Sequence, residues 1–161
     1  MPKEPTPDEK PKPKCLISIP LGANSDTYYE DIFIPAIEEA GFIAIRADDL
    51  YSAGDKLNNI GISTKEATVL LADLTGKNAV VLYQLGLAHA ITRAVILITA
   101  SMEDVPSDLR TLRVIDYDKN LLKWDNLLQK KITHALLEIS KNPYFAIAPT
   151  FFESENAEKQ E

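Results

Sequence analysis

The stretch LADLTGKNAVVLYQLGLAHA, residues 71–90, gives the clearest indication of the fold class. It starts inside an apolar run (68–74), passes through a polar turn and continues as an apolar helix over about 79–92. A buried strand, a tight turn and a helix in this order form the repeating unit of a parallel α/β sheet. The helix carries an uncharged amide, Gln84, on a face that it is expected to share with Val80, Leu87 and Ile91.

The same alternation of apolar runs and helical spacing occupies most of the chain. Further strands are predicted at 15–19, 42–47, 94–99 and 112–117, and further helices at 26–41, 55–66 and 119–140. Because Pro35 lies inside the first of these helices and lacks a backbone N–H, we expect a bend there. The predicted strands at 68–74 and 94–99 are nearly continuous apolar runs, which is typical of burial on both faces. The sequence therefore predicts a doubly wound, three-layer α/β sandwich with a five-stranded parallel sheet, of the flavodoxin or Rossmann-like class.

Composition argues against several classes of function. The 161 residues carry 17 Lys and Arg against 24 Asp and Glu, a net charge of −7, whereas a protein that binds duplex nucleic acid needs a basic face. One cysteine, Cys15, and two histidines are too few for a structural zinc site, so no metal is expected. No apolar run reaches the roughly 18 residues of a membrane span, and the first residues lack the apolar core of a signal peptide. We therefore expect a cytoplasmic protein that binds no membrane.

The two ends of the chain differ in composition from its centre. Residues 1–14 are almost wholly Pro, Lys, Glu, Asp and Thr, which cannot bury enough apolar surface to offset the entropy cost of ordering them. The last residues are acidic in the same way. We predict a disordered leader over 1–14, one α/β domain over 15–142, and a largely disordered tail over 143–161.

Ligands of a doubly wound sheet bind beyond the carboxyl ends of the strands, so the segments there are candidates for a site. PLGANSD (20–26) contains a glycine that permits close approach of a ligand but lacks the remaining residues of a P-loop, and an ordinary turn explains it as well. RADD (46–49) ends the second strand. Its carboxylates either accept hydrogen bonds from ribose hydroxyls or cap the next segment and pair with Arg46.

DLTGKN (73–78) follows the third strand, with Asp73 just past the buried run, Gly76 in the turn and Asn78 as the helix cap. Turn chemistry explains most of this segment without a ligand. The first two turns of the next helix point toward the ligand edge of the sheet, so we expect Gln84 to face an open cavity there. A structural amide with its hydrogen bonds satisfied is the other interpretation.

Several of these segments together resemble one known superfamily. They are IPAIEEAGFIAIRADD (34–49), LLADLTGKN (70–78), YQLGLAHA (83–90), AVILIT (94–99) and PSDLRTLRVIDYD (106–118). Over about residues 15–118 the chain resembles the nucleoside 2-deoxyribosyltransferase-like proteins, which include nucleotide N-glycosidases and are distantly related to TIR-type folds. The resemblance implies a parallel α/β sandwich and attack on the sugar C1′ of a nucleoside or nucleotide, with no metal or organic cofactor. It is more specific for the family than for the substrate.

The family's nucleophile is a Glu in a YELG motif, and the matching position here is Gln84. That carboxylate would act as in a retaining glycosidase, stabilising an oxocarbenium-like centre and then bonding to it. An amide is nearly isosteric but a very poor nucleophile, so we expect the covalent step to be lost or severely slowed and the binding geometry to survive. Either Gln84 is an introduced change in an active hydrolase or transferase, or the natural protein is a non-catalytic nucleotide-binding or sensor module. A TIR-like NAD hydrolase is a third possibility.

The resemblance also assigns roles to other residues. Asp73 and Asn78 would orient the sugar or base, Tyr83 would pack beside the nucleophile position, and the loop after the first strand would hold the 5′ end. Expected partners are a nucleoside or nucleotide and, because a second subunit completes the pocket in several relatives, another copy in a homodimer or larger homo-oligomer. In chain order the assigned residues are Ile19, Pro20, Leu21, Gly22, Asp48, Asp49, Asp73, Gly76, Asn78, Tyr83 and Gln84.

Overall fold

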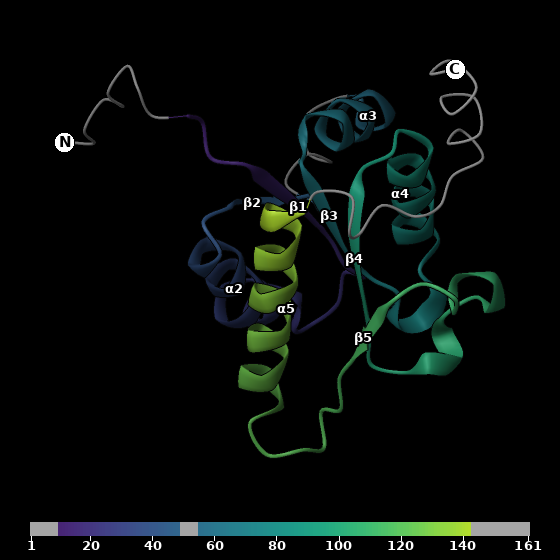
Figure 1. Cartoon of the computed structure of the whole chain (residues 1–161). Coiled ribbons are helices and arrows are strands. Elements are labelled where there is room, and N and C mark those ends of the chain that lie inside the picture. Colours follow the sequence, from purple (N-terminus) through teal and green to yellow (C-terminus); the bar gives the residue numbers. More distant parts are fainter. Residues whose placement is uncertain (1–9, 49–54, 143–161) are drawn as a thin grey trace, which may run out of the picture.

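The computed structural model describes residues 10–48 and 55–142 and shows a parallel sheet between two layers of helices (Figure 1). In this part of the chain the sheet has five strands in the order β2-β1-β3-β4-β5, and every neighbouring pair is parallel. The strands are β1 (Lys14–Ser18), β2 (Ile43–Arg46), β3 (Val69–Asp73), β4 (Ala94–Thr99) and β5 (Val114–Asp116). The predicted fold class is thus confirmed.

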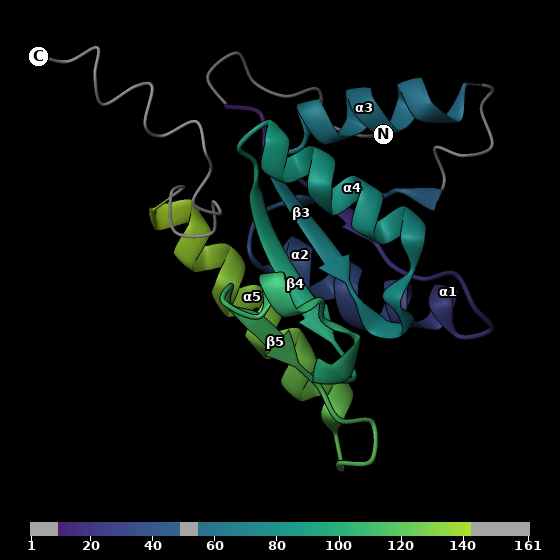
Figure 2. The ribbon, with the colours of Figure 1, turned by 90° about the vertical axis from the view of Figure 1, so that its right-hand side faces the viewer.

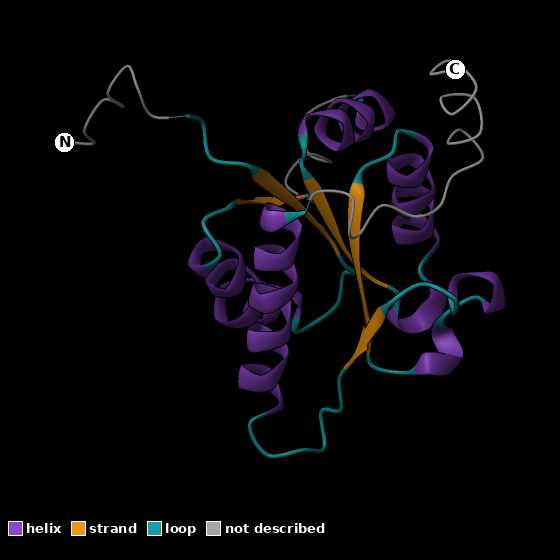
Figure 3. Cartoon of the chain, viewed as in Figure 1, coloured by secondary structure: helices purple, strands orange, loops and turns teal. Residues whose placement is uncertain are grey.

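Helices cover both faces of the sheet, as Figure 3 shows with the strands in orange between them. One layer contains α1 (Ser25–Tyr28), a π-helical turn (Tyr29–Phe33), α2 (Ile34–Glu39) and α5 (Trp124–Lys141). The other layer contains α3 (Lys56–Glu66) and α4 (Ala79–Ala90), which face the viewer in Figure 2. Short 3₁₀ turns occupy Thr75–Lys77, Met102–Asp104 and Ser107–Leu109.

The alternation of side chains along the strands divides the core into two halves. In β1, Cys15 and Ile17 pack under the α2 and α5 layer, whereas Leu16 packs under α4 with Leu85. Successive strand residues point to opposite faces, so a strand covered on both sides is apolar throughout. All residues of β3 and β4 are buried. The uninterrupted apolar runs of the sequence therefore correspond to the two strands at the centre of the sandwich.

The strand order creates a crevice beside the end of β1. The chain passes from β1 to β2 on one side and returns to β3 on the other side of β1. Connections that leave a strand in opposite directions separate at its carboxyl end, and ligands of doubly wound sheets bind in that gap. The crevice between the ends of β1, β2 and β3 is therefore the first place to look for a site.

Two predicted helices differ in detail from the structure. The 26–41 helix changes type along its length, because a π-helical turn precedes Pro35, which has no N–H for an α-helical carbonyl. The last helix begins at Trp124 instead of near 119. The intervening residues form a turn in which Asp118 Oδ1 accepts the N–H of Asn120 at 2.9 Å. Both differences arise from local hydrogen bonding of backbone N–H groups, which the apolar spacing does not report.

The predicted leader and tail lie mostly outside the described residues, namely over 1–9 and 143–161. At the start of the described part, Lys14 already belongs to β1 and pairs with Ile43 of β2, one residue before the predicted domain start. Within the described ranges, no helix is both long enough and apolar enough to cross a bilayer.

Candidate functional site

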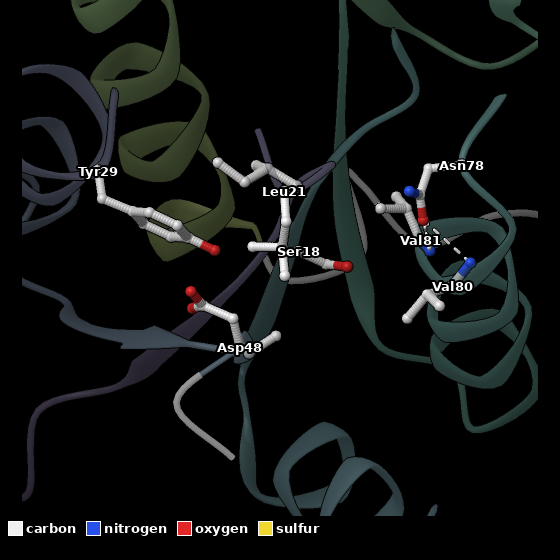
Figure 4. Close-up of a pocket in the computed structure, with 9 residues that line it drawn as sticks. Ser18, Leu21, Tyr29, Asp48, Asn78, Val80 and Val81 are labelled. Carbon is white, nitrogen blue, oxygen red and sulfur yellow. Dashed lines mark hydrogen bonds between the residues drawn. The ribbon is translucent and has the colours of Figure 1, made fainter. Parts of the chain in front are cut away.

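A pocket of about 140 Å³ lies at the carboxyl ends of β1 and β2, beside the start of α4 (Figure 4). Four segments form it: the end of β1 with the loop that follows, the residues after β2, the first turn of α4, and one ring from the π-helical turn. In chain order the lining residues are Ser18, Ile19, Leu21, Tyr29, Ala47, Asp48, Asn78, Val80 and Val81. The pocket thus occupies the crevice at which the strand order reverses.

One wall of the pocket carries a carboxylate that an arginine holds in place. Arg46 donates to both oxygens of Asp48, from Nη2 to Oδ2 at 2.8 Å and from Nε to Oδ1 at 3.1 Å. These bonds hold the pKa of Asp48 below its ordinary value, against the opposing effect of partial burial. The Tyr29 hydroxyl points toward the same carboxylate (Figure 4) and also favours its charged form. The pocket therefore contains an ionised carboxylate at neutral pH.

Arg46 makes two further contacts that fix this wall. Its Nη2 lies 2.6 Å from Oδ1 of Asp26 in α1, and its guanidinium carbon lies 3.9 Å from the centroid of the Tyr29 ring. Of the two interpretations of RADD, pairing with Arg46 is observed for Asp48, and this pairing leaves the carboxylate at the pocket. Asp49 lies outside the described residues.

The opposite wall is the start of α4. Asn78 caps this helix as predicted, since its Oδ1 accepts the N–H groups of Val80 at 3.0 Å and Val81 at 3.2 Å, drawn as dashed lines in Figure 4. The preceding turn needs the left-handed backbone at Gly76, whose φ is +76° and which glycine adopts without strain. Because the cap occupies its oxygen, Asn78 has amide N–H groups to offer a ligand.

Gln84 lies behind the pocket wall and is absent from the lining set. Its side chain is 0% exposed, and the Ser18 hydroxyl, which does line the pocket, donates a hydrogen bond to its Oε1. The expectation that the amide faces this cavity is therefore corrected, because one side chain stands between them. The prediction that Gln84 shares its face of the helix with Val80 is also wrong, since Gln84 is buried whereas Val80 is 48% exposed. The buried face of α4 consists of Val81, Gln84, Leu85 and Ala88.

Asp73 is buried in a hydrogen-bond network that joins the ends of β3 and β5. Its Oδ1 accepts the backbone N–H of Thr75 at 3.0 Å and the Thr75 hydroxyl at 2.6 Å, and its Oδ2 accepts the Tyr117 hydroxyl at 2.7 Å. Burial raises the pKa of Asp73, while these three donors act in the opposite direction. Asp73 does not line the pocket. Its observed contacts hold the turn that leads into α4.

The remaining assigned residues divide between the pocket and its surroundings. Ile19 and Leu21 line the pocket, whereas Pro20 and Gly22 belong to the same loop without lining it. Tyr83 is 57% exposed on the outer side of α4, and it and Gly76 are likewise absent from the lining set. The structure thus brings together four of the assigned residues, namely Ile19, Leu21, Asp48 and Asn78.

Sequence reasoning missed the rest of the lining set. Ser18 sits inside an apolar strand run, and Tyr29 lies within the predicted 26–41 helix, where an aromatic side chain is typical of the core. The signal that pointed to the pocket was the RADD segment with its arginine. Among the lining residues that the structure describes, Asp48 is the one charged side chain, and none is Lys, Arg or His. Within residues 10–48 and 55–142, no group of three or more His, Cys, Asp or Glu side chains could hold a metal ion.

Comparison with solved structures identifies a protein of similar fold. The CMP N-glycosidase BcmB of Clostridium botulinum shares 21% identity with this chain at a TM-score of 0.56, over 75% of this chain and 99% of its own. The Vibrio vulnificus NanR protein complexed with ManNAc-6P is 15% identical over 92% of this chain and 55% of its own, and its TM-score of 0.48 is too low to bear on the fold. No family model and no curated protein matches the sequence. The chain therefore shares its overall fold with BcmB.

Proposed function

We propose that this domain binds a nucleoside or nucleotide in the pocket between β1, β2 and α4. The observation that carries the proposal is the pairing of an ionised Asp48 with the Asn78-capped start of α4 in one pocket at the switch point of the sheet. The first group accepts hydrogen bonds and the second donates them, and a sugar with its attached base presents both kinds of partner. The fold shared with a CMP N-glycosidase supports this ligand class.

The size of the pocket suits part of such a ligand. Its volume of about 140 Å³ is below the roughly 300–1,000 Å³ of sites that enclose drug-sized molecules, so it accommodates a sugar ring better than a whole nucleotide. Leu21 and Val80 are 60% and 48% exposed and line the pocket. The remainder of the ligand would lie over these apolar side chains.

We further propose that this chain binds without cleaving, because Gln84 supplies no nucleophile. N-glycosidic chemistry of the retaining kind needs a carboxylate that bonds to the sugar C1′ as the base departs. The amide of Gln84 is neutral, it is buried, and its oxygen already accepts the Ser18 hydroxyl. A nucleotide-binding module is therefore the function that this chain supports best.

Binding is tested by isothermal titration calorimetry with cytidine, CMP, adenosine, AMP and NAD. Leu21→Trp should fill the mouth of the pocket and weaken binding of whichever ligand the wild type takes. Leu57→Trp is the matched control, because Leu57 is similarly exposed (67%) on α3 and does not line the pocket. The proposal is wrong if the wild type binds none of these compounds, or if both variants bind as it does.

The second candidate function is N-glycosidase activity, which would need Glu at position 84, and the contact between Ser18 and Gln84 favours it. Glu is nearly isosteric with Gln, so a carboxylate at position 84 would accept the same hydroxyl one side chain from the pocket. Gln84→Glu is then assayed chromatographically for release of free base from the same ligands, with Gln129→Glu on α5 as the control. Base release by Gln84→Glu alone supports an N-glycosidase site; binding without any release leaves only the binding module.

A further inference from the structure

The polar groups on the β1 and β2 side of the pocket are hydrogen-bond acceptors. Ser18 gives its hydroxyl hydrogen to Gln84 Oε1, so the lone pairs of its oxygen are what it can offer to a ligand. Asp48 offers carboxylate oxygens, and its side chain keeps 17% of its surface exposed. A ligand group that faces this side must therefore bring hydrogen-bond donors.

Arg46 orients the Asp48 carboxylate through one bond to each of its oxygens. A carboxylate has about four acceptor sites, and the two bonds from Arg46, at 2.8 and 3.1 Å, occupy one site on each oxygen of Asp48. The Tyr29 hydroxyl (Figure 4) and the backbone N–H of Asp48 also interact with this carboxylate, so a donor from the ligand would bind it by replacing the Tyr29 hydroxyl or by sharing an oxygen with it. Because Arg46 also bonds Asp26 and lies over the Tyr29 ring, the carboxylate is fixed before any ligand arrives.

Charge limits which part of a nucleotide can face Asp48. The nine lining residues within 10–48 and 55–142 include no cationic side chain, and the guanidinium of Arg46 is already directed at Asp48 and Asp26. A phosphate placed against Asp48 would meet a like charge with no cation of the lining set to offset it. A neutral hydroxyl meets a strong acceptor instead.

We propose that the pocket recognises its ligand by the secondary hydroxyls of the sugar, which donate hydrogen bonds to the Asp48 carboxylate that Arg46 holds in place. The ligand class is then a ribonucleoside or ribonucleotide, bound with its ring hydroxyls toward β2 and any phosphate directed elsewhere. Asp48 is the specificity-determining residue, and Arg46 is a positioning residue. This inference rests on the proposed function and specifies which end of the ligand enters the pocket.

The first experiment needs only the wild-type protein. Calorimetric titration compares cytidine and adenosine with their 2′-deoxy, 3′-deoxy and 2′,3′-dideoxy forms. A hydrogen bond to a charged acceptor corresponds to a loss of about tenfold or more in affinity when its donor is removed, and we expect that loss for the dideoxy compounds. The two monodeoxy compounds then show which hydroxyl makes the contact.

The second experiment uses a matched pair of variants. Asp48→Asn and Asp26→Asn each remove one carboxylate bonded to Arg46, but only Asp48 lines the pocket. We expect Asp48→Asn to bring the ratio of ribo to dideoxy affinity close to one, and Asp26→Asn to keep the wild-type ratio. If Asp48→Asn does not fold, Arg46→Lys serves in its place, because lysine retains the charge but not the two-point contact.

The outcomes separate this inference from the proposed function. If ribonucleosides and dideoxynucleosides bind with the same affinity, hydroxyl recognition by Asp48 is overturned while nucleoside binding stands. An equal fall of the ratio of ribo to dideoxy affinity in Asp26→Asn and Asp48→Asn also overturns it. The effect would then come from the loss of a partner of Arg46 and not from the loss of an acceptor in the pocket. Absence of binding by every compound overturns both proposals together.

Discussion

The Ser18 hydroxyl donates a hydrogen bond to the amide oxygen of Gln84, and this contact joins the end of β1 to α4 directly behind the pocket. Both side chains are almost completely excluded from solvent, at 2% and 0% exposure. A buried amide is tolerated when its polar atoms are bonded, so the contact explains how α4 carries Gln84 on its inner face. The same contact places position 84 one side chain away from the pocket.

Replacing Ser18 by Ala should destabilise the fold. The variant leaves the buried amide oxygen of Gln84 without this donor, which costs about 1–3 kcal/mol in the free energy of unfolding. Urea unfolding followed by circular dichroism measures the change. Ser140→Ala is the control, because the Ser140 hydroxyl bonds the Leu136 carbonyl of its own helix at 3.1 Å and alanine is favourable there. Equal stability of wild type and Ser18→Ala would show that the contact contributes nothing.

The Tyr117 hydroxyl should stabilise the fold more at neutral pH than in acid. Burial raises the pKa of Asp73, so the unfolded chain loses this proton first as pH rises from about 3.9, and the contribution of Asp73 to stability falls across that window. Tyr117 opposes this fall by donating to the charged form at 2.7 Å. Tyr117→Phe should therefore lose about 1.5–3 kcal/mol at pH 7 and less in acid, where Asp73 is protonated.

The measurement is urea unfolding of wild type and Tyr117→Phe at several pH values from acid to neutral. Tyr28→Phe is the control, because the Tyr28 ring also packs on Trp124, at a centroid distance of 5.7 Å, but its hydroxyl is not the one bonded to Asp73. A deficit of Tyr117→Phe that is largest in acid would contradict the assigned role of the hydroxyl.

The Cys15 thiol should be unreactive toward thiol reagents in the folded protein. It is 0% exposed within β1, and burial raises the pKa of its thiol to about 12, so almost no thiolate forms near neutral pH. We expect no reaction with Ellman's reagent in native buffer and one equivalent per chain in denaturant, since the sequence has a single cysteine. Rapid labelling of the native protein would mean that β1 opens readily or lies at an accessible edge.

Self-association should involve the exposed side of α4. Ala79, Val80, Tyr83, Gly86 and Ala90 form an exposed face without a charged side chain on a chain whose net charge is −7. Apolar surface of this kind is where two like-charged copies can meet without repulsion. We expect a dimer by light scattering, and Tyr83→Lys should shift it toward monomer. Leu127→Lys on α5 is the control of similar exposure (47%), and a wild-type monomer at all concentrations would contradict the expectation.

Much of the fold could be predicted from sequence because its signals are local. The apolar runs at β3 and β4 report burial on both faces, and the two faces of the sheet follow from the alternation of side chains. The Asn78 cap could be predicted for the same reason, since its oxygen bonds N–H groups two and three residues along the chain. Helix ends were less accurate where a turn or a proline changed the local hydrogen bonding, as before Trp124 and at Pro35.

The site could be predicted only in part, because its groups meet through contacts between distant segments. Asp48 and Asn78 follow the ends of β2 and β3, and position at a strand end is readable from sequence. The bond between Ser18 and Gln84 spans 66 residues, and that between Tyr117 and Asp73 spans 44. No periodicity in either segment reports such a partner.

The sequence by itself determined the class of sheet. Ligand binding at the carboxyl edge of that sheet, and Gln84 in the place of a catalytic carboxylate, stay predictions. The tertiary structure decided which way that amide faces, because the rotation of α4 on the sheet is set by packing of Val81, Leu85 and Ala88 against the strands. It also decided that Arg46 orients Asp48 at the pocket wall, since the arginine is fixed by Asp26 and Tyr29 from another layer. Local spacing selects elements, whereas the packing of side chains between them selects the groups that meet at a site.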